Sequence, residues 1–220
     1  MENQIYLIRG EERETYPEFS KRILSAAKML REDIKVSVTL TESKPPTLSV
    51  IPFRKNKIAA VSVSTPIKQV LEQLADIPGF AGAYKVDKAF PIKYRRNWDP
   101  GTVTPGLCLL TLFRKKKNLN HDTFIHRWHN GHTPLTLEVH PIYHYNRNVI
   151  LETLTPDSEP FDGIVEEHVE KPSLLFNPAR FFGGPLKMPW NMLRVYRDVN
   201  SFLDYKSIEP YLCREYVMGG

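Results

Sequence analysis

Cysteine is scarce in this chain, which excludes a covalently cross-linked scaffold. The 220 residues include only Cys108 and Cys213, far apart in sequence. Two cysteines are too few for a disulfide framework, and no Cys-x-x-Cys pair indicates a zinc or dithiol site. Each cysteine stands in an apolar, strand-like run. We therefore expect two buried free thiols and a reducing, cytoplasmic compartment.

Long apolar runs and strong charge are also missing. No segment approaches the ~20 apolar residues that cross a bilayer, and residues 1–14 lack the apolar stretch of a signal peptide. The net charge is +5, and its lysines and arginines stand in short separate groups. Phosphate binding needs cations clustered on one face. The sequence therefore predicts neither a nucleic-acid partner nor a membrane partner, and the lack of a glycine-rich phosphate loop argues against nucleotide cofactors.

The apolar pattern predicts the element order β-α-β-β-α-β twice. The first copy has a helix after Pro17 and a second helix that opens at Pro66, with Thr65 as its cap. The predicted strands of the first copy are 4–9, 34–40, 58–63 and 79–86, with a further brief strand at 48–51. The second copy has strands at 107–113, 142–152, 163–169 and 210–217, and helices at 121–138 and 191–203.

This order predicts an α+β protein of two tandem ferredoxin-like units, residues 1–98 and 107–220, joined by a linker at 99–106. A four-stranded sheet with helices on one face leaves its other face bare. Two such sheets can cover each other within one chain and form a barrel with the helices outside. Because the first and last strands of such a unit are neighbours, Cys108 and Cys213 should lie close together.

The second half carries a recognisable series of residues. A basic-ended strand and turn run from Phe113 to Phe124, and Trp128 follows on the helix. His132-Thr133-Pro134-Leu135 comes next, and then Tyr145-Asn146-Arg147-Asn148 on a strand. This series resembles the EthD-like family of the dimeric α+β barrel superfamily. The resemblance covers most of residues 107–220, whereas residues 1–98 match only by strand order, as a degenerate copy would.

The resemblance implies the barrel fold first and a choice of chemistries second. Some relatives are dehydratases or decarboxylases of aromatic compounds, and oxidoreductase activity is commonly attached to the domain. The wider barrel group includes cofactor-free monooxygenases, lactone isomerases and haem enzymes. Fold similarity cannot choose among these reactions, so the residues must decide.

Histidine is concentrated in one region, because six of the seven lie between His121 and His144. Phe124, Trp128 and His132 share one face of the predicted helix, and Pro134 interrupts its hydrogen bonds. A pocket could open at that weak point, where a neutral imidazole can take or give a proton near pH 7. In the alternative interpretation, His132 only bonds the carbonyls freed by Pro134.

A metal site is a further alternative, with His126, His129 and His132 spaced along the helix and His144 or Glu138 as an added ligand. No HExxH pattern occurs, and solvated histidines explain the spacing better, so we assign no metal. On the following strand, His144 and Asn146 point one way, while Tyr145 and Arg147 point the other way. Residues 171–190, rich in Phe, Pro and Gly, predict a long loop that covers a site, meets a partner or packs on the rim.

The sequence therefore favours a cofactor-independent enzyme that performs acid/base chemistry of the dehydratase, decarboxylase or isomerase type on a small apolar or aromatic substrate. The alternatives are a non-catalytic module for a small ligand or partner, and an oxidoreductase or its accessory. Haem or a metal remains compatible with the sequence, as do a monomer with a pseudo-dimeric barrel and a homodimer. The expected catalytic residue is His132, and the expected substrate-binding residues are Phe113, Trp128, His129, His144, Tyr145 and Arg147.

Overall fold

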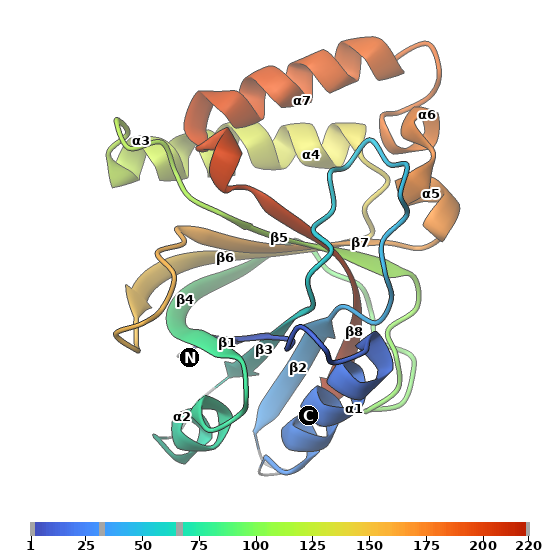
Figure 1. Ribbon diagram of the computed structural model, residues 1–220. Coiled ribbons are helices and arrows are strands. Elements are labelled where there is room, and N and C mark those ends of the chain that lie inside the picture. Colours follow the sequence, from blue (N-terminus) through green and yellow to red (C-terminus); the bar gives the residue numbers. More distant parts are fainter. Residues whose placement is uncertain (1–2, 31–33, 65–67, 219–220) are drawn as a thin grey trace.

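Eight strands close into one antiparallel barrel in the computed structural model, which describes residues 3–30, 34–64 and 68–218 (Figure 1). The strand order is β1-β3-β2-β8-β5-β7-β6-β4. The strands are β1 (Asn3–Arg9), β2 (Lys35–Leu40), β3 (Ile58–Ser64), β4 (Phe80–Ile92), β5 (Leu107–Phe113), β6 (His144–Thr153), β7 (Gly163–Val169) and β8 (Glu209–Met218). The predicted α+β barrel is confirmed.

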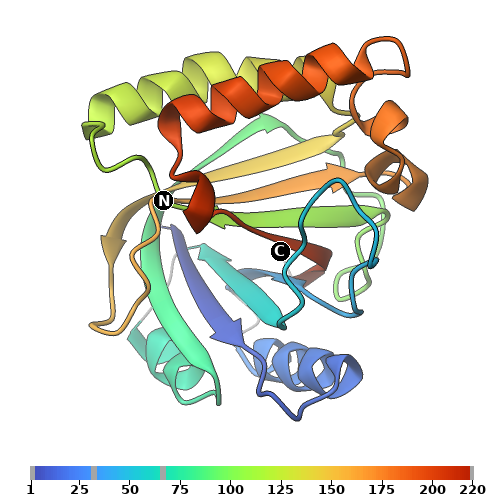
Figure 2. The same ribbon diagram turned by 45° about the horizontal axis from the view of Figure 1, so that its top comes forward.

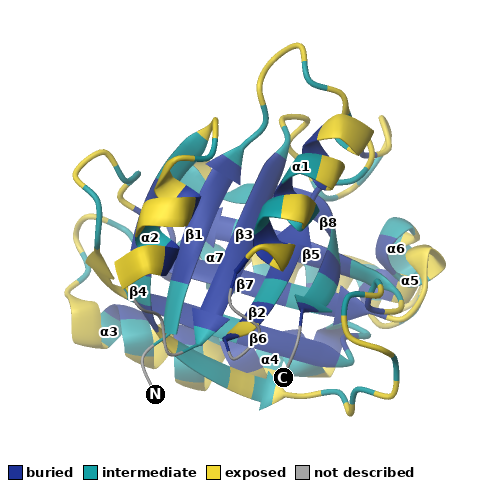
Figure 3. Ribbon diagram, turned by 90° about the horizontal axis from the view of Figure 1, so that it is seen from below, coloured by how far each residue is buried: buried dark blue, intermediate teal, exposed yellow. Residues whose placement is uncertain are grey.

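Helices cover the outside of the barrel in two groups (Figures 1 and 2). The helices α1 (Tyr16–Lys28) and α2 (Lys68–Ala75) lie on one side, where the strands beneath them are buried and their outer faces are exposed (Figure 3). The helices α3 (His121–His126), α4 (Thr133–Val139) and α7 (Met188–Phe202) lie on the opposite side, and the short helices α5 (Pro172–Phe176) and α6 (Pro178–Phe181) lie at one end. Within the described ranges, no helix is long and apolar enough to cross a membrane.

The strand pairing joins distant parts of the chain. β2 pairs with β8, and β4 pairs with β6, so strands from both ends of the sequence share one barrel wall. Cys108 on β5 is the direct cross-strand partner of Cys213 on β8, and both are buried free thiols. The predicted proximity of the two cysteines without a disulfide is therefore confirmed.

Two predictions of local structure are wrong. Residues 48–51 form no strand, because this proline-rich segment crosses the surface as bends. The segment 171–190 is not a plain loop, because it contains α5, α6 and the start of α7. Pro172, Pro178 and Pro189 each stand in the first turn of one of these helices, where proline costs no hydrogen bond. The predicted helix start at Thr65 and Pro66 lies outside the described residues.

The helix predicted at 121–138 is continuous but changes its winding. A π-helical segment, η1 (Arg127–His132), separates α3 from α4. The backbone N–H of Thr133 bonds to the carbonyl of Trp128, five residues back, and its hydroxyl donates to the same oxygen over 3.0 Å. Pro134 has no backbone N–H to donate, and the helix accommodates it by forming one wider, π-helical turn just before it. Such turns are frequent at functional sites.

Gly163 at the start of β7 gives a direct test of the packing under this helix. A Cβ atom there would lie 2.5 Å from Cε2 of Phe113 and 2.7 Å from Cη2 of Trp128, both in buried rings. Gly163→Ala should therefore lower the free energy of unfolding by ~1–3 kcal/mol, measured by urea denaturation. The control is Gly131→Ala, whose Cβ would meet only Asp198 Oδ1 at 3.7 Å. An equal loss in both variants would contradict this packing.

Candidate active site

A cavity of about 360 Å³ lies between the helical segments η1, α4 and α7 and the outer face of the barrel. We call it the helix-side cavity. One helical stripe supplies Trp128, His132, Thr136 and His140, four residues apart each time. The sheet, α6 and α7 supply the other walls. Those residues include Phe113, Thr111, Tyr145, Val165, Glu167, Phe181, Val195, Val199 and Phe202. The lining is mostly apolar with a few polar groups, which is typical of a small-molecule site.

His132 is held in this cavity by a carboxylate from another helix. Its Nδ1 lies 2.6 Å from Oδ2 of Asp198 on α7, and its Nε2 lies 3.2 Å from the hydroxyl of Thr136. Because a carboxylate accepts hydrogen bonds, Asp198 places the imidazole proton on Nδ1 in the neutral ring. The Nε2 lone pair is then available, next to a hydroxyl that can rotate away. The ring also packs against Phe202, with centroids 5.3 Å apart.

Glu167 is the second titratable group that lines the cavity. It stands on β7, and the accessible part of its side chain faces the cavity. Burial raises the pKa of its carboxyl to about 7, against the opposing effect of the charge of His132. No hydrogen bond to this carboxyl is found in the part of the chain that the structure describes. Glu167 is therefore a carboxyl that can be acid or base near neutral pH.

The wall beside these two groups is built from Trp128 and Tyr145. Trp128 Nε1 donates to the Tyr145 hydroxyl over 3.4 Å, and the indole packs edge-on against Phe113 at 4.9 Å. Burial raises the pKa of Tyr145, so its hydroxyl stays neutral. Arg147 donates to the hydroxyl of Thr133 over 2.9 Å, and its guanidinium lies 5.9 Å from the Trp128 ring. It supports the wall from behind.

The sequence-predicted site residues divide into two groups. His132, Trp128, Tyr145 and Phe113 line the cavity. His129, Arg147 and His144 do not line it. Burial and the nearby Arg147 lower the pKa of the His129 imidazole to about 4, so this ring is neutral at pH 7.

The position of His144 follows from strand alternation. Its strand neighbour Tyr145 faces the helices, so His144 faces the barrel interior together with Asn146. The sequence left open which of these two faces carries the substrate groups. In the structure Tyr145 lines the helix-side cavity, whereas His144 and Asn146 line a second cavity inside the barrel.

Sequence reasoning missed Glu167 and Asp198. For Glu167 there was a signal, since Glu166 and Glu167 are adjacent inside an otherwise apolar strand. Consecutive residues of a strand point to opposite faces, so a strand buried on both faces must bury one carboxylate in each. For Asp198 there was none, because its contact with His132 joins residues 66 positions apart.

The raised pKa of Glu167 predicts a pH-dependent stability. An unfolded glutamate ionises near pH ~4.3, whereas the folded one does so near 7. The folded state binds the extra proton between these values, so stability falls as the pH rises through this window and is constant above it. Glu167→Gln cannot suffer this loss. Its stability relative to the parent should grow by ~1–3 kcal/mol between pH 5 and pH 8 in urea denaturation.

The matched control is Glu170→Gln, which alters an exposed carboxylate just beyond the same strand. It should follow the parent at both pH values. If Glu167→Gln also follows the parent, the carboxyl is not buried in the cavity as described.

Comparisons with known proteins identify the architecture only. No family model and no curated protein matches the chain. Among solved structures, it is similar to an anthrone oxidase-like protein, with a TM-score of 0.59, 10% identity, and coverage of 99% of this chain and 91% of that one. It is also similar to a proposed monooxygenase from Lactobacillus acidophilus NCFM, with a TM-score of 0.50, 9% identity, and coverage of 99% and 96%. At this identity the likeness concerns the fold, which is that of an α+β barrel. Membership of the EthD-like family stays a prediction.

Proposed function

We propose that this protein is an enzyme that moves a proton on a small apolar or aromatic substrate bound in the helix-side cavity. The observation that carries the proposal is the pairing of two proton-transfer groups in one apolar space. His132, oriented by Asp198, and Glu167, with its pKa near 7, line the same cavity. Groups with a pKa near the working pH are the most effective general acids and bases.

We assign a role to each group. His132 accepts a proton from an acidic C–H of the substrate on Nε2, and Asp198 stabilises the imidazolium that results. The protonated form of Glu167 donates a proton to an oxygen of the substrate. In a dehydration, that oxygen leaves as water when the C–O bond breaks. In an isomerisation, it becomes an enol and the proton returns to a different carbon.

The cavity wall supports a proposal for the kind of substrate. Trp128, Phe113 and Phe202 offer ring faces and edges, and Tyr145 offers a neutral hydroxyl. About 360 Å³ is near the lower end of ligand pockets, so it accommodates one compact molecule. A flat aromatic ketone with an acidic C–H satisfies these conditions. We therefore infer this substrate class.

A second candidate function is a cofactor-free oxidation that begins with the same step. Its support is the similarity in fold to the anthrone oxidase-like protein. Removal of a proton from carbon between aromatic rings gives an electron-rich anion, which can react directly with dioxygen. His132 would again be the base, and dioxygen would be the oxidant. The two candidates differ only in whether oxygen is consumed.

A test uses a panel of aromatic ketones with an acidic C–H, including anthrone. In D₂O without oxygen, the protein should accelerate exchange of that hydrogen for deuterium, measured by NMR. His132→Ala should reduce the acceleration ~10²–10⁴-fold, because general-base catalysis contributes about this much. Asp198→Asn should show a smaller loss, because the imidazole remains but loses its orienting charge. Oxygen uptake in air would select the second candidate.

The control is His126→Ala, which removes an exposed histidine from the same helix. It should retain the exchange rate of the parent, and all variants should be compared at equal folded fraction by thermal melting. Full activity of His132→Ala would contradict the proposal. Binding of the panel without any exchange would favour a ligand-binding module instead.

A further inference from the structure

The inner face of the barrel contains a second cavity, separate from the proposed proton-transfer site. It has a volume of about 430 Å³, and its lining includes residues of β2, β3, β4, β6 and β8. Its lining is polar and includes Lys88, Tyr94, His144, Asn146 and Glu215. None of these residues contributes to the helix-side cavity. The lining of the interior cavity is therefore polar, whereas that of the helix-side cavity is mostly apolar.

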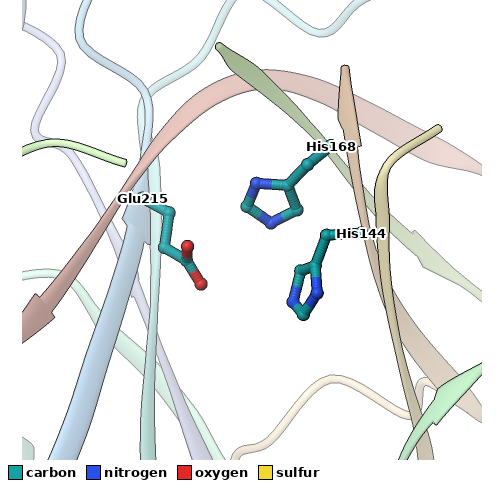
Figure 4. Close-up of side chains that lie close together, drawn as sticks. All are labelled: His144, His168 and Glu215. Carbon is teal, nitrogen blue, oxygen red and sulfur yellow. The ribbon is translucent and has the colours of Figure 1, made fainter. Parts of the chain in front are cut away.

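Two histidines and a carboxylate from three strands converge beside this cavity, and two of them, His144 and Glu215, line it. His144 on β6, His168 on β7 and Glu215 on β8 each offer one ligand atom, and these atoms lie within 4.8 Å of one another (Figure 4). The three residues are 3%, 1% and 6% exposed. Strand register produces this convergence, because His144 is the direct cross-strand partner of His168.

His168 has an unsatisfied ring nitrogen at this point. Its Nε2 is buried and has no hydrogen-bond partner among the residues that the structure describes. Burial lowers the pKa of His144 to about 3 and of His168 to about 4, so both rings are neutral. A buried polar atom without a partner costs free energy. A neutral imidazole with a free lone pair is also the form that binds metal ions.

The carboxylate of Glu215 is oriented by its own hydrogen bonds. The hydroxyls of Tyr94 and Thr104 both donate to Oε2, each over 2.8 Å. Among the described residues no hydrogen bond to the other oxygen, Oε1, is found, so this oxygen is available to a further ligand. Bonds of this kind, which fix a ligand from behind, are typical of metal sites in proteins.

The charges of the interior are of both signs. Two buried carboxylates, Glu166 and Glu215, act on the ammonium group of Lys88, which donates to Ser62 over 2.8 Å. Glu166 is engaged by Thr39 and Asn146. Of these two carboxylates, Glu215 is therefore the one that can take part in binding a further group.

We propose that His144, His168 and Glu215 bind one divalent transition-metal ion inside the barrel. Two nitrogen ligands and one oxygen ligand suit zinc or iron(II) rather than calcium or magnesium, which prefer oxygen. Three protein ligands leave coordination positions open toward the cavity. Lys93 and Arg96 line that cavity, so a small anion could occupy an open position.

One contact must change when the metal binds. The backbone N–H of Tyr94 lies 3.3 Å from Nδ1 of His144, which places the proton of the neutral ring on Nε2. Metal binding through Nε2 moves that proton to Nδ1, so the Tyr94 amide must withdraw. Trp98 packs on Tyr94 with ring centroids 4.9 Å apart. Metal binding should therefore alter the fluorescence of Trp98, and Trp98→Phe should abolish this change.

The test is a titration of the full chain, prepared without a histidine tag and stripped with a chelator. Zinc should bind with a stoichiometry of one by calorimetry, and cobalt(II) should give visible absorption bands typical of a site with nitrogen ligands. His168→Gln and Glu215→Gln should each weaken zinc binding more than ~10-fold. Glu215→Gln keeps an acceptor for Tyr94 and Thr104, which protects the fold.

Two controls test histidines outside the proposed site. His140→Gln removes a histidine packed against Phe181 on the helix side, and His126→Ala removes an exposed one. Both should bind zinc like the parent. Unchanged affinity in Glu215→Gln and His168→Gln, with melting temperatures near that of the parent, would overturn the proposal. A parent chain that fails to bind zinc one to one would overturn it as well.

Discussion

The two-residue period of β6 and β7 is the constraint on which both cavities depend. In a closed barrel each strand has one face toward the interior and one toward the covering helices, and consecutive side chains alternate between them. Tyr145 and Glu167 are cross-strand partners that face the helices. The neighbouring pair, His144 and His168, faces the interior. Two different environments are therefore built from two pairs of adjacent residues, one pair on each strand.

Electrostatics distinguishes the two environments. On the helix side, an apolar lining leaves the carboxyl of Glu167 without a hydrogen-bond partner in the described chain, so desolvation dominates and the pKa rises to about 7. In the interior, burial also raises the pKa of Glu215, but its carboxylate accepts bonds from Tyr94 and Thr104, which oppose this effect and fix its orientation. The first arrangement suits proton transfer. The second suits a fixed ligand.

The fold could be predicted from the sequence because local patterns decide it. The predicted bounds of β5 and β7 agree with the structure, since each is a compact apolar run between turn residues. Barrel closure followed from the bare face that each half would otherwise leave. The interior and the helix side are both buried, however, so an apolar-polar alternation could not show which face of β6 meets the helices.

The site could be predicted only in part, for a similar physical reason. His132 and Trp128 lie on one helix, so their spacing gives their shared face. The partners of the histidines come from remote segments. Asp198 reaches His132 from α7, and Glu215 reaches His144 and His168 from the last strand. Such contacts depend on the tertiary arrangement, which no single stretch of sequence contains.

The start of β7 limits how this protein can diverge. Gly163 is packed against Phe113 and Trp128, and β7 directs Glu167 toward the helix-side cavity and Glu166 and His168 toward the interior. A single-residue insertion or deletion inside β7 would turn Glu167 inward and His168 outward, since a slip of one position inverts every side chain of a strand. Both cavities would lose a defining group in one genetic event. Length variation among descendants should accordingly be confined to the connections between strands, and β7 should keep seven residues.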